Sequence, residues 1–282
     1  MMVLAVAALF AGATALAAGP AAVRKQVEAS MLVTGRIQVD SDGRVSGFSL
    51  DEKEKLPEGV VDLIGKTVPE WAFEPVLIDG KPVNVSTGMS IRLIARKTGK
   101  DSYSVGIRSA SFGHRSGKKE EQVRSLSMAP PNYPEDAARA GVTGTAYLLV
   151  RAGRDGKVID VIAEQVNLRV VASEASMTKW RRVLGETSMR QARRWTFIPP
   201  TEGEEAKADF WVLRVPVVFS LEDSPGAMQQ YGRWEAYVPG PRQANPWEKD
   251  KEGVAFSPDT LAPGRAHLAG SGLKLLTNLS DS

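Results

Sequence analysis

The chain has 282 residues, of which 43% are hydrophobic, and this is enough for two domains with modest cores. Its 36 basic and 33 acidic residues leave a formal charge of +3 without a long basic block, which argues against nucleic acid as a partner. Because the sequence contains no cysteine, thiol chemistry and thiolate metal sites are excluded.

The N-terminal segment has the features of an export signal. Residues 3–18 are an uninterrupted run of apolar and small side chains, followed by Gly19. Residues 1–18 are therefore interpreted as a signal peptide. A short membrane anchor is the alternative, although the run of about sixteen residues is shorter than the roughly twenty that a spanning helix needs. Met1-Met2 supplies no positive charge, which leaves open a start codon further upstream.

One short pattern occurs twice, an Asp-Gly-basic-Val turn followed by Trp-x-Phe-x-Pro. The first copy is Asp42-Gly43-Arg44-Val45 with Trp71-Ala72-Phe73-Glu74-Pro75. The second copy is Asp155-Gly156-Lys157-Val158 with Trp195-Thr196-Phe197-Ile198-Pro199. This recurrence indicates one small fold used twice. The Trp and Phe of each copy are two residues apart and are expected on one side of a strand, packed in the core.

The first unit is expected over residues 28–112. Two β-rich runs joined by Asp42-Gly43 predict a hairpin. Pro57 suits the first turn of a helix, in which Val60 and Ile64 share one face. The expected elements are strands over 31–40 and 44–50, a helix over 56–68, and strands over 70–78, 83–95 and 102–111.

A linker is expected over residues 113–127, the second unit over 128–222, and a Pro/Gly-rich tail over 223–282 that lies on the domains or is partly disordered. Gly185 is a candidate break in the longest expected helix of the second unit. The expected elements are helices over 135–140 and 173–194 and strands over 142–152, 157–166, 195–198 and 208–221. The fold class is thus α+β, with two tandem β-β-α-β units, each an antiparallel sheet packed on one helix.

The sequence lacks the motifs of common enzymes, with no Gly-x-Ser-x-Gly, no phosphate-binding loop and no His-Glu-x-x-His. His114 and His267 have no carboxylate or second histidine at ligand spacing, and both are interpreted as surface loop residues. We therefore expect a non-enzymatic protein without catalytic residues, cofactor or metal.

The second unit resembles the C-terminal domain of TonB-family energy transducers. The resemblance spans residues 129–221, and its motifs are Asn132-Tyr133-Pro134, the Asp155-Gly156 turn, Trp195-x-Phe197-x-Pro199 and the closing Val215–Phe219 strand. Residues 31–95 look like a diverged copy that lacks Tyr-Pro. The family has a membrane anchor followed by a Pro-rich spacer, and no such spacer precedes the first unit here.

The resemblance implies a periplasmic domain that recruits outer-membrane transporters by strand addition. By position, the matching edge is the strand over 208–221, and Tyr133-Pro134 matches the partner-facing segment. Because Pro216 cannot donate a backbone hydrogen bond, its backbone is expected to face outward from the sheet. A tail that caps this edge is the alternative. The predicted partner-binding residues are Tyr133, Pro134, Arg214, Pro216, Val218 and Ser220.

The leading hypothesis is a periplasmic protein that binds outer-membrane transporters or other envelope proteins by β-strand addition, in support of transmembrane transport. The alternative is a structural envelope or assembly protein that forms homodimers through the same edge strand, without energy coupling. If the N-terminus is an anchor, the protein is expected in the inner membrane with its domains in the periplasm, and inner-membrane motor proteins are further candidate partners.

Overall fold

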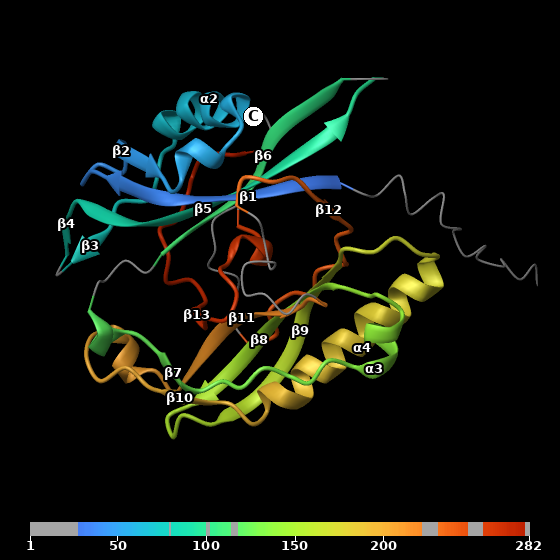
Figure 1. Cartoon of the computed structure of the whole chain (residues 1–282). Helices are drawn as coiled ribbons and strands as arrows, with labels where there is room; N and C mark the ends of the chain where they lie inside the picture. The colour runs from blue at the N-terminus through green and yellow to red at the C-terminus, as the bar shows by residue number, and fades with distance from the viewer. Residues whose placement is uncertain are drawn as a thin grey trace, which may run out of the picture.

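The computed structural model describes residues 28–78, 80–99, 102–113, 118–221, 231–247 and 256–279. The interpreted signal peptide and His114 lie outside the described residues. Two antiparallel sheets face each other, each with a helix on its outer side, and C-terminal segments run between them (Figure 1). The predicted α+β class with antiparallel sheets is confirmed.

The first sheet has the strand order β12-β1-β5-β6, and β2 also pairs with β1. Helix α2 begins directly after Pro57 and buries Val60 and Ile64 in the core of this unit. Burial of such an apolar face supplies most of the stability of a short helix. The elements in chain order are β1 (Glu28–Val39), β2 (Val45–Leu50), α2 (Glu58–Thr67), β3 (Leu77–Ile78), β4 (Lys81–Pro82), β5 (Val85–Lys97) and β6 (Tyr103–Phe112).

The second sheet has the strand order β13-β11-β8-β9. Ser173 caps helix α4, because its hydroxyl accepts a hydrogen bond from the Ser176 N–H at 3.3 Å. The predicted break at Gly185 is wrong, since α4 is continuous there and Gly185 packs closely on Ala163 and Val166. The elements are α3 (Glu135–Arg139), β8 (Gly144–Gly153), β9 (Val158–Leu168), α4 (Glu174–Ala192), β10 (Thr196–Ile198) and β11 (Phe210–Phe219).

The two Asp-Gly turns make the same contacts with the Trp-x-Phe motifs that follow them. The Phe73 N–H donates to the Gly43 carbonyl oxygen at 2.8 Å, and the Phe197 N–H donates to the Gly156 carbonyl oxygen at 2.8 Å. Gly43 and Gly156 have φ values of 85° and 76°, the left-handed region that favours glycine. Each turn is therefore held against its own Trp-x-Phe segment by backbone bonds.

The tryptophans of both motifs are core residues, as the sequence predicts. Trp71 is 2% exposed in the first core, and Trp195 is 3% exposed in the second. Phe73 packs edge-on against Trp71, with ring centroids 6.5 Å apart. Both tryptophan rings are therefore almost completely buried.

The structure differs from the sequence prediction in two connecting segments. The strand expected over 70–78 is mostly irregular, because a 3₁₀ turn, Val68–Glu70, overlaps its start, Ala72 and Phe73 form only isolated β-bridges, and Leu77–Ile78 is a two-residue strand. The linker expected over 113–127 includes strand β7 (Arg124–Ser127), which pairs with β10. This pairing is between segments far apart in sequence, and local composition does not reveal it.

The described part of the tail touches both units. Strand β12 (Glu235–Tyr237) pairs with β1 of the first unit, and strand β13 (His267–Leu268) pairs with β11 of the second. Leu273 and Leu275 then return to the first core. Apolar burial of this kind explains why a segment rich in Gly and polar residues is ordered.

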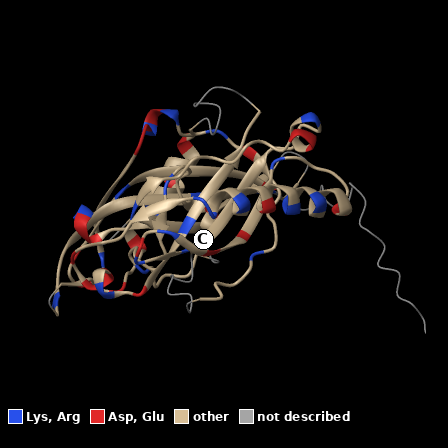
Figure 2. Cartoon of the chain, turned by 90° about the horizontal axis from the view of Figure 1, so that it is seen from below, with Lys and Arg blue, Asp and Glu red and all other residues tan. Residues whose placement is uncertain are grey.

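Figure 2 marks basic positions, in blue, along the ribbon of α4. The exposed basic residues of this helix include Lys179, Arg182 and Arg190. Within the described residues, no helix combines the length and the apolar character needed to cross a membrane.

Candidate partner-binding edge

Strand β11 has one side paired with β8 and one side turned away from it. Pro216 pairs with Tyr147 of β8, and because proline has no N–H, residue 216 must turn its backbone away from β8. Alternate residues of a strand share this orientation. On the outward side, the Ala269 N–H donates to the Val212 carbonyl oxygen at 2.9 Å. The outward direction deduced from Pro216 agrees with this bond.

The tail covers part of this outward side. Strand β13 pairs Leu268 with Leu213 and His267 with Arg214. Of the two alternatives, an open edge and an edge capped by the tail, the structure has the second at these two positions. The prediction of Arg214 as a partner-contacting residue does not fit this state, because β13 occupies the backbone edge there.

The Arg214 side chain is also engaged. It is 2% exposed, and its Nε donates to Oε2 of Glu164 on β9 at 2.9 Å. The guanidinium carbon lies 4.6 Å from the centre of the Phe256 ring. Arg242 reaches the same carboxylate, with 2.8 Å between its Nη2 and Glu164 Oε1. Two guanidinium groups thus compensate one buried carboxylate, and the cluster connects β9, β11 and the tail.

Sequence reasoning missed this cluster. Glu164 lies within the strand predicted over 157–166 and is 1% exposed, so an acid in an apolar strand was the available signal. Its two arginine partners lie 50 and 78 residues further along the chain. Phe256 comes from the tail, which the sequence predicts only to lie on the domains or to be partly disordered. Pairing of this kind depends on tertiary structure and leaves little local trace.

Beyond Arg214, the outward side of β11 borders an apolar cavity of about 180 Å³. Pro216 and Val218 line it on one side, and Pro263 and Gly264 of the tail line it on the other. Trp195 and the segment around Pro130-Pro131 complete the wall. Val218 and Ser220 are partly exposed, whereas Pro216 is buried. The cavity is suited to an apolar side chain, because its exposed lining is mostly apolar.

Tyr133 lies at the C-terminal end of β11. Its hydroxyl donates to the Val142 carbonyl oxygen at 2.5 Å, and its ring packs edge-on against Phe219 with centroids 5.4 Å apart. Burial raises the pKa of Tyr133, which keeps the hydroxyl protonated as a donor at neutral pH. Pro134 follows as the residue before helix α3. Tyr133 is thus brought close to the end of β11 that carries Val218 and Ser220.

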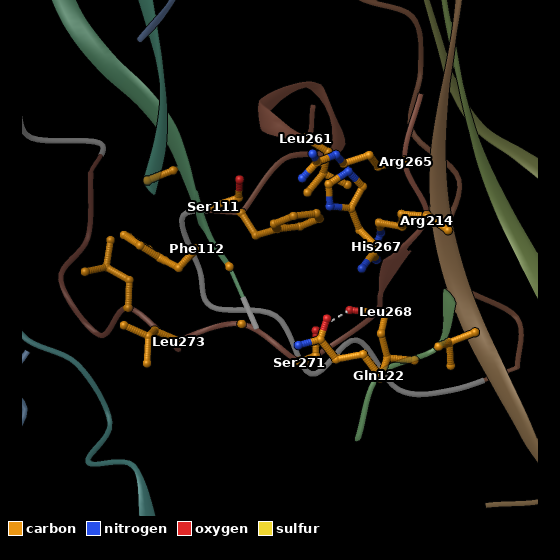
Figure 3. Close-up of a pocket in the computed structure, with 17 residues that line it drawn as sticks. Ser111, Phe112, Gln122, Arg214, Leu261, Arg265, His267, Leu268, Ser271 and Leu273 are labelled. Carbon is orange, nitrogen blue, oxygen red and sulfur yellow. Dashed lines mark hydrogen bonds between the residues drawn. The ribbon is translucent and has the colours of Figure 1, made fainter. Parts of the chain in front are cut away.

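A second cavity of about 340 Å³ lies between the units, next to β13 (Figure 3). His267 and Arg214 line it from the second unit and its tail, and Ser111 and Phe112 line it from β6. The interpretation of His267 as a surface loop residue is wrong, because it pairs with Arg214 and is only partly exposed. Burial lowers the pKa of His267, and the nearby Arg265 lowers it further, against a bond to the Ala262 carbonyl that raises it.

The tail also forms a buried polar junction between the two units. The Tyr237 hydroxyl donates to Asp259 Oδ2 at 2.7 Å and accepts from the Asn167 amide at 3.1 Å. Arg92 of β5 lies 3.9 Å from the same carboxylate oxygen of Asp259. Burial raises the pKa of Tyr237, so its hydroxyl stays protonated. The junction connects β12 and the segment around Asp259 to β5 and β9.

Within the described ranges, no three His, Asp or Glu side chains are grouped so that they could hold a metal ion. The best candidate for a binding site is instead the outward side of β11. Backbone groups of the strand, an apolar cavity and Tyr133 lie close together there. Such an arrangement can accept an extended chain as an additional strand, because an exposed strand edge presents unpaired N–H and C=O groups.

Comparisons with known proteins agree with the family resemblance. The chain is 34% identical over 100 residues to Protein TonB of Xanthomonas campestris pv. campestris strain B100, and the same values hold for Protein TonB of a second strain of this pathovar. The match covers 35% of this chain and 38% of each relative, so the chain spans well under two thirds of the curated relatives that it matches. These similarities support a TonB-like C-terminal domain in the chain. No protein-family profile matches, and no solved structure matches significantly.

Proposed function

We propose that this chain is a non-enzymatic periplasmic protein with a TonB-like role in envelope transport. It binds an extended segment of an outer-membrane transporter, or of another envelope protein, by β-strand addition at the outward side of β11. The observation that carries the proposal is that Pro216 turns this side of β11 away from β8, beside an apolar cavity. The class of partner is what the resemblance to TonB-family transducers implies, and the similarity to Protein TonB supports that resemblance.

Each predicted residue has a role in this proposal. Val218 offers backbone groups to the incoming strand, Ser220 lies next along the same side, and Pro216 leaves one donor missing, which weakens pairing there by roughly 1 kcal/mol. Tyr133 and Pro134 border the end of the edge, with Tyr133 packed on Phe219. The outward backbone groups of Arg214 become available to a partner only when β13 leaves β11, because Arg214 is paired with His267 of β13.

We further infer that the first unit is a diverged copy of the second. Both place a hairpin closed by an Asp-Gly turn beside a long third strand, β5 or β11, that pairs with the first strand of the hairpin. The matching bonds from Phe73 to Gly43 and from Phe197 to Gly156 support the same inference. The first copy lacks Tyr-Pro, and the binding role is assigned to the second.

The proposed location follows from the N-terminal segment. A signal peptide over residues 1–18 delivers both units to the periplasm. If the segment is an anchor instead, the units lie in the periplasm while the chain stays attached to the inner membrane, and inner-membrane motor proteins become additional partners. Comparing the size of the exported chain in the soluble and membrane fractions distinguishes these two cases.

In-cell photo-crosslinking tests the proposed function. A crosslinking amino acid at position 218 is expected to trap an outer-membrane transporter, identified by mass spectrometry of the adduct. Position 105 is the matched control, because Val105 lies on β6, at the outer edge of the first sheet, and is also partly exposed. The control position is expected to give no transporter adduct.

Two outcomes contradict the proposal. If position 218 yields only dimers of this chain, the same edge serves self-association, and a structural or assembly role replaces recruitment of a transporter. If positions 218 and 105 give equal amounts of a transporter adduct, the contact is not specific to the β11 edge.

A further inference from the structure

The side of β11 assigned above to a partner already has an occupant from the same chain. Its backbone bond runs from the Ala269 N–H to the Val212 carbonyl oxygen, and its paired positions are His267 with Arg214 and Leu268 with Leu213. We define residues 263–269 as the resident strand segment. Its residues 267–269 run antiparallel to β11, as an added strand would.

The contrast with the first unit shows how short this cover is. There, the outer side of β5 pairs with β6 from Met89 to Lys97. Strand β6 follows β5 directly in the chain, and closing such a short connection costs little conformational entropy. In the second unit, only two residues of β13 pair with β11, and they come from far along the sequence. The outer side of β5 is thus paired along most of its length, whereas the outer side of β11 is paired with β13 at two residues.

The resident strand segment stops pairing where Pro216 removes a donor. Continuing its register places Arg265 opposite Pro216 and Pro263 opposite Val218. Neither Pro216 nor Pro263 has a backbone N–H, so a regular ladder cannot form between these positions. Instead, Pro263 and Gly264 border the apolar cavity that Pro216 and Val218 line from the other side. The outward side of β11 is therefore paired at one end and unpaired at the other.

The anchors of the tail lie outside the resident strand segment. On its N-terminal side, Asp259 and Thr260 are buried, and Asp259 belongs to the polar junction with Tyr237. On its C-terminal side, Leu273 and Leu275 are buried in the first core. Within the segment, Ala266 and Leu268 pack against the second core, and Leu268 is the larger of the two side chains. The segment can therefore leave β11 while the tail stays attached at both ends.

We propose that the resident strand segment blocks the partner-binding edge in cis, and that a partner must displace it. This inference rests on the proposed function. The fitting partner is an extended segment that places an apolar side chain where Leu268 lies and a backbone N–H where Ala269 donates. Because only the uncovered fraction of molecules is competent, the apparent affinity for any such strand is lowered by that fraction.

A peptide-binding experiment with the full chain tests this proposal. The probe is a fluorescent peptide of residues 262–272, and its binding is followed by fluorescence anisotropy. Leu268→Asp releases the resident strand segment, since it replaces the apolar anchor by a charge. This variant is expected to bind the peptide at least about tenfold more tightly than the wild type. Leu276→Asp is the matched control, because Leu276 lies in the same tail and is 55% exposed.

A reversible disulfide between β11 and the resident strand segment, called here the lock, provides a second test if Leu268→Asp disturbs folding. The chain has no cysteine, so Val212→Cys with Ala269→Cys creates a single thiol pair. These positions form a hydrogen-bonded antiparallel pair, with Cα atoms about 5.5 Å apart, within the range of a disulfide. The oxidised protein is expected to bind no peptide, and reductant is expected to restore binding to the level of the reduced variant.

The outcomes separate this proposal from the proposed function. Equal peptide binding by wild type, Leu268→Asp and the oxidised lock would overturn blocking in cis, and so would a lack of binding by all of them. If Leu268→Asp binds the peptide while position 218 traps no transporter, blocking stands and the transporter proposal fails. If the oxidised lock traps the transporter as well as the reduced form does, blocking fails and the transporter proposal stands.

Discussion

The Gly156 carbonyl oxygen accepts a hydrogen bond of 2.8 Å from the Phe197 N–H, and a Cβ atom built on Gly156 would lie 2.1 Å from the Phe197 carbonyl oxygen. The turn and the Trp-x-Phe segment are in direct backbone contact. Gly43 and Phe73 have the same two relationships, at 2.8 Å and 2.1 Å. The repeated sequence pattern therefore corresponds to one repeated backbone contact, called here the turn joint. It attaches the Asp-Gly turn of a hairpin to the Trp-x-Phe segment that follows the helix.

Replacing Gly156 by alanine is expected to destabilise the second unit by about 2–4 kcal/mol, because it combines a strained φ with a clash against backbone that cannot move aside. Gly141→Ala is the matched control, since Gly141 also has a positive φ of 66° but no atom near its missing Cβ. It is expected to cost about 1 kcal/mol. Urea denaturation measures both, and equal losses would show that the joint contributes nothing beyond backbone strain.

Glu164→Gln is expected to lower the free energy of unfolding by about 3–5 kcal/mol, because it removes the buried negative charge that the Arg214 and Arg242 guanidinium groups contact. Glu204→Gln is the control, because Glu204 also forms an ion pair, with Lys207. The Glu204 side chain, however, is 89% exposed. Its expected cost is below about 0.5 kcal/mol. Thermal or urea unfolding of the two variants checks this difference, and a small effect at Glu164 would mean that the cluster is not formed.

Acidification is expected to weaken the docking of β13 through His267. Its pKa in the folded protein is below the ordinary 6.5, so the folded state binds the proton less readily than the unfolded state. The stability that depends on neutral His267 is therefore present above pH 6.5 and decreases as the pH falls through and below this value. The positive charge of the neighbouring Arg265 acts in the same direction on the pKa of the ring.

The comparison with His267→Gln isolates this effect. Wild type is expected to lose more unfolding free energy than His267→Gln between pH 7.5 and pH 5, measured by urea denaturation at each pH. Parallel losses in the two proteins would show that other groups account for the acid sensitivity.

The sequence predicted the features that depend on residues close together in the chain. The Asp-Gly turns, Pro57 before α2 and the buried Trp-x-Phe pairs all follow from short-range preferences. The outward orientation of Pro216 also follows from one covalent fact, its missing N–H.

The remaining features depend on contacts between distant segments. Nothing near His267 or Leu268 in the sequence suggests a strand, and their pairing with β11 arises because the anchored ends of the tail bring them there. The burial of Arg214 likewise needs Glu164 and Phe256, which lie on other elements. Interactions of this kind are decided by tertiary structure, which overrides local composition.

The most direct measurement changes one backbone donor at the edge of β11. Val218→Pro removes an outward N–H and leaves the ladder to β8 intact, because residue 218 has the same orientation as Pro216. Val218→Thr keeps both the N–H and the branched shape. With a crosslinking amino acid at position 220 in cells, we expect Val218→Pro to lose the transporter adduct and Val218→Thr to retain it. An equal adduct yield from both variants would contradict strand addition at this edge.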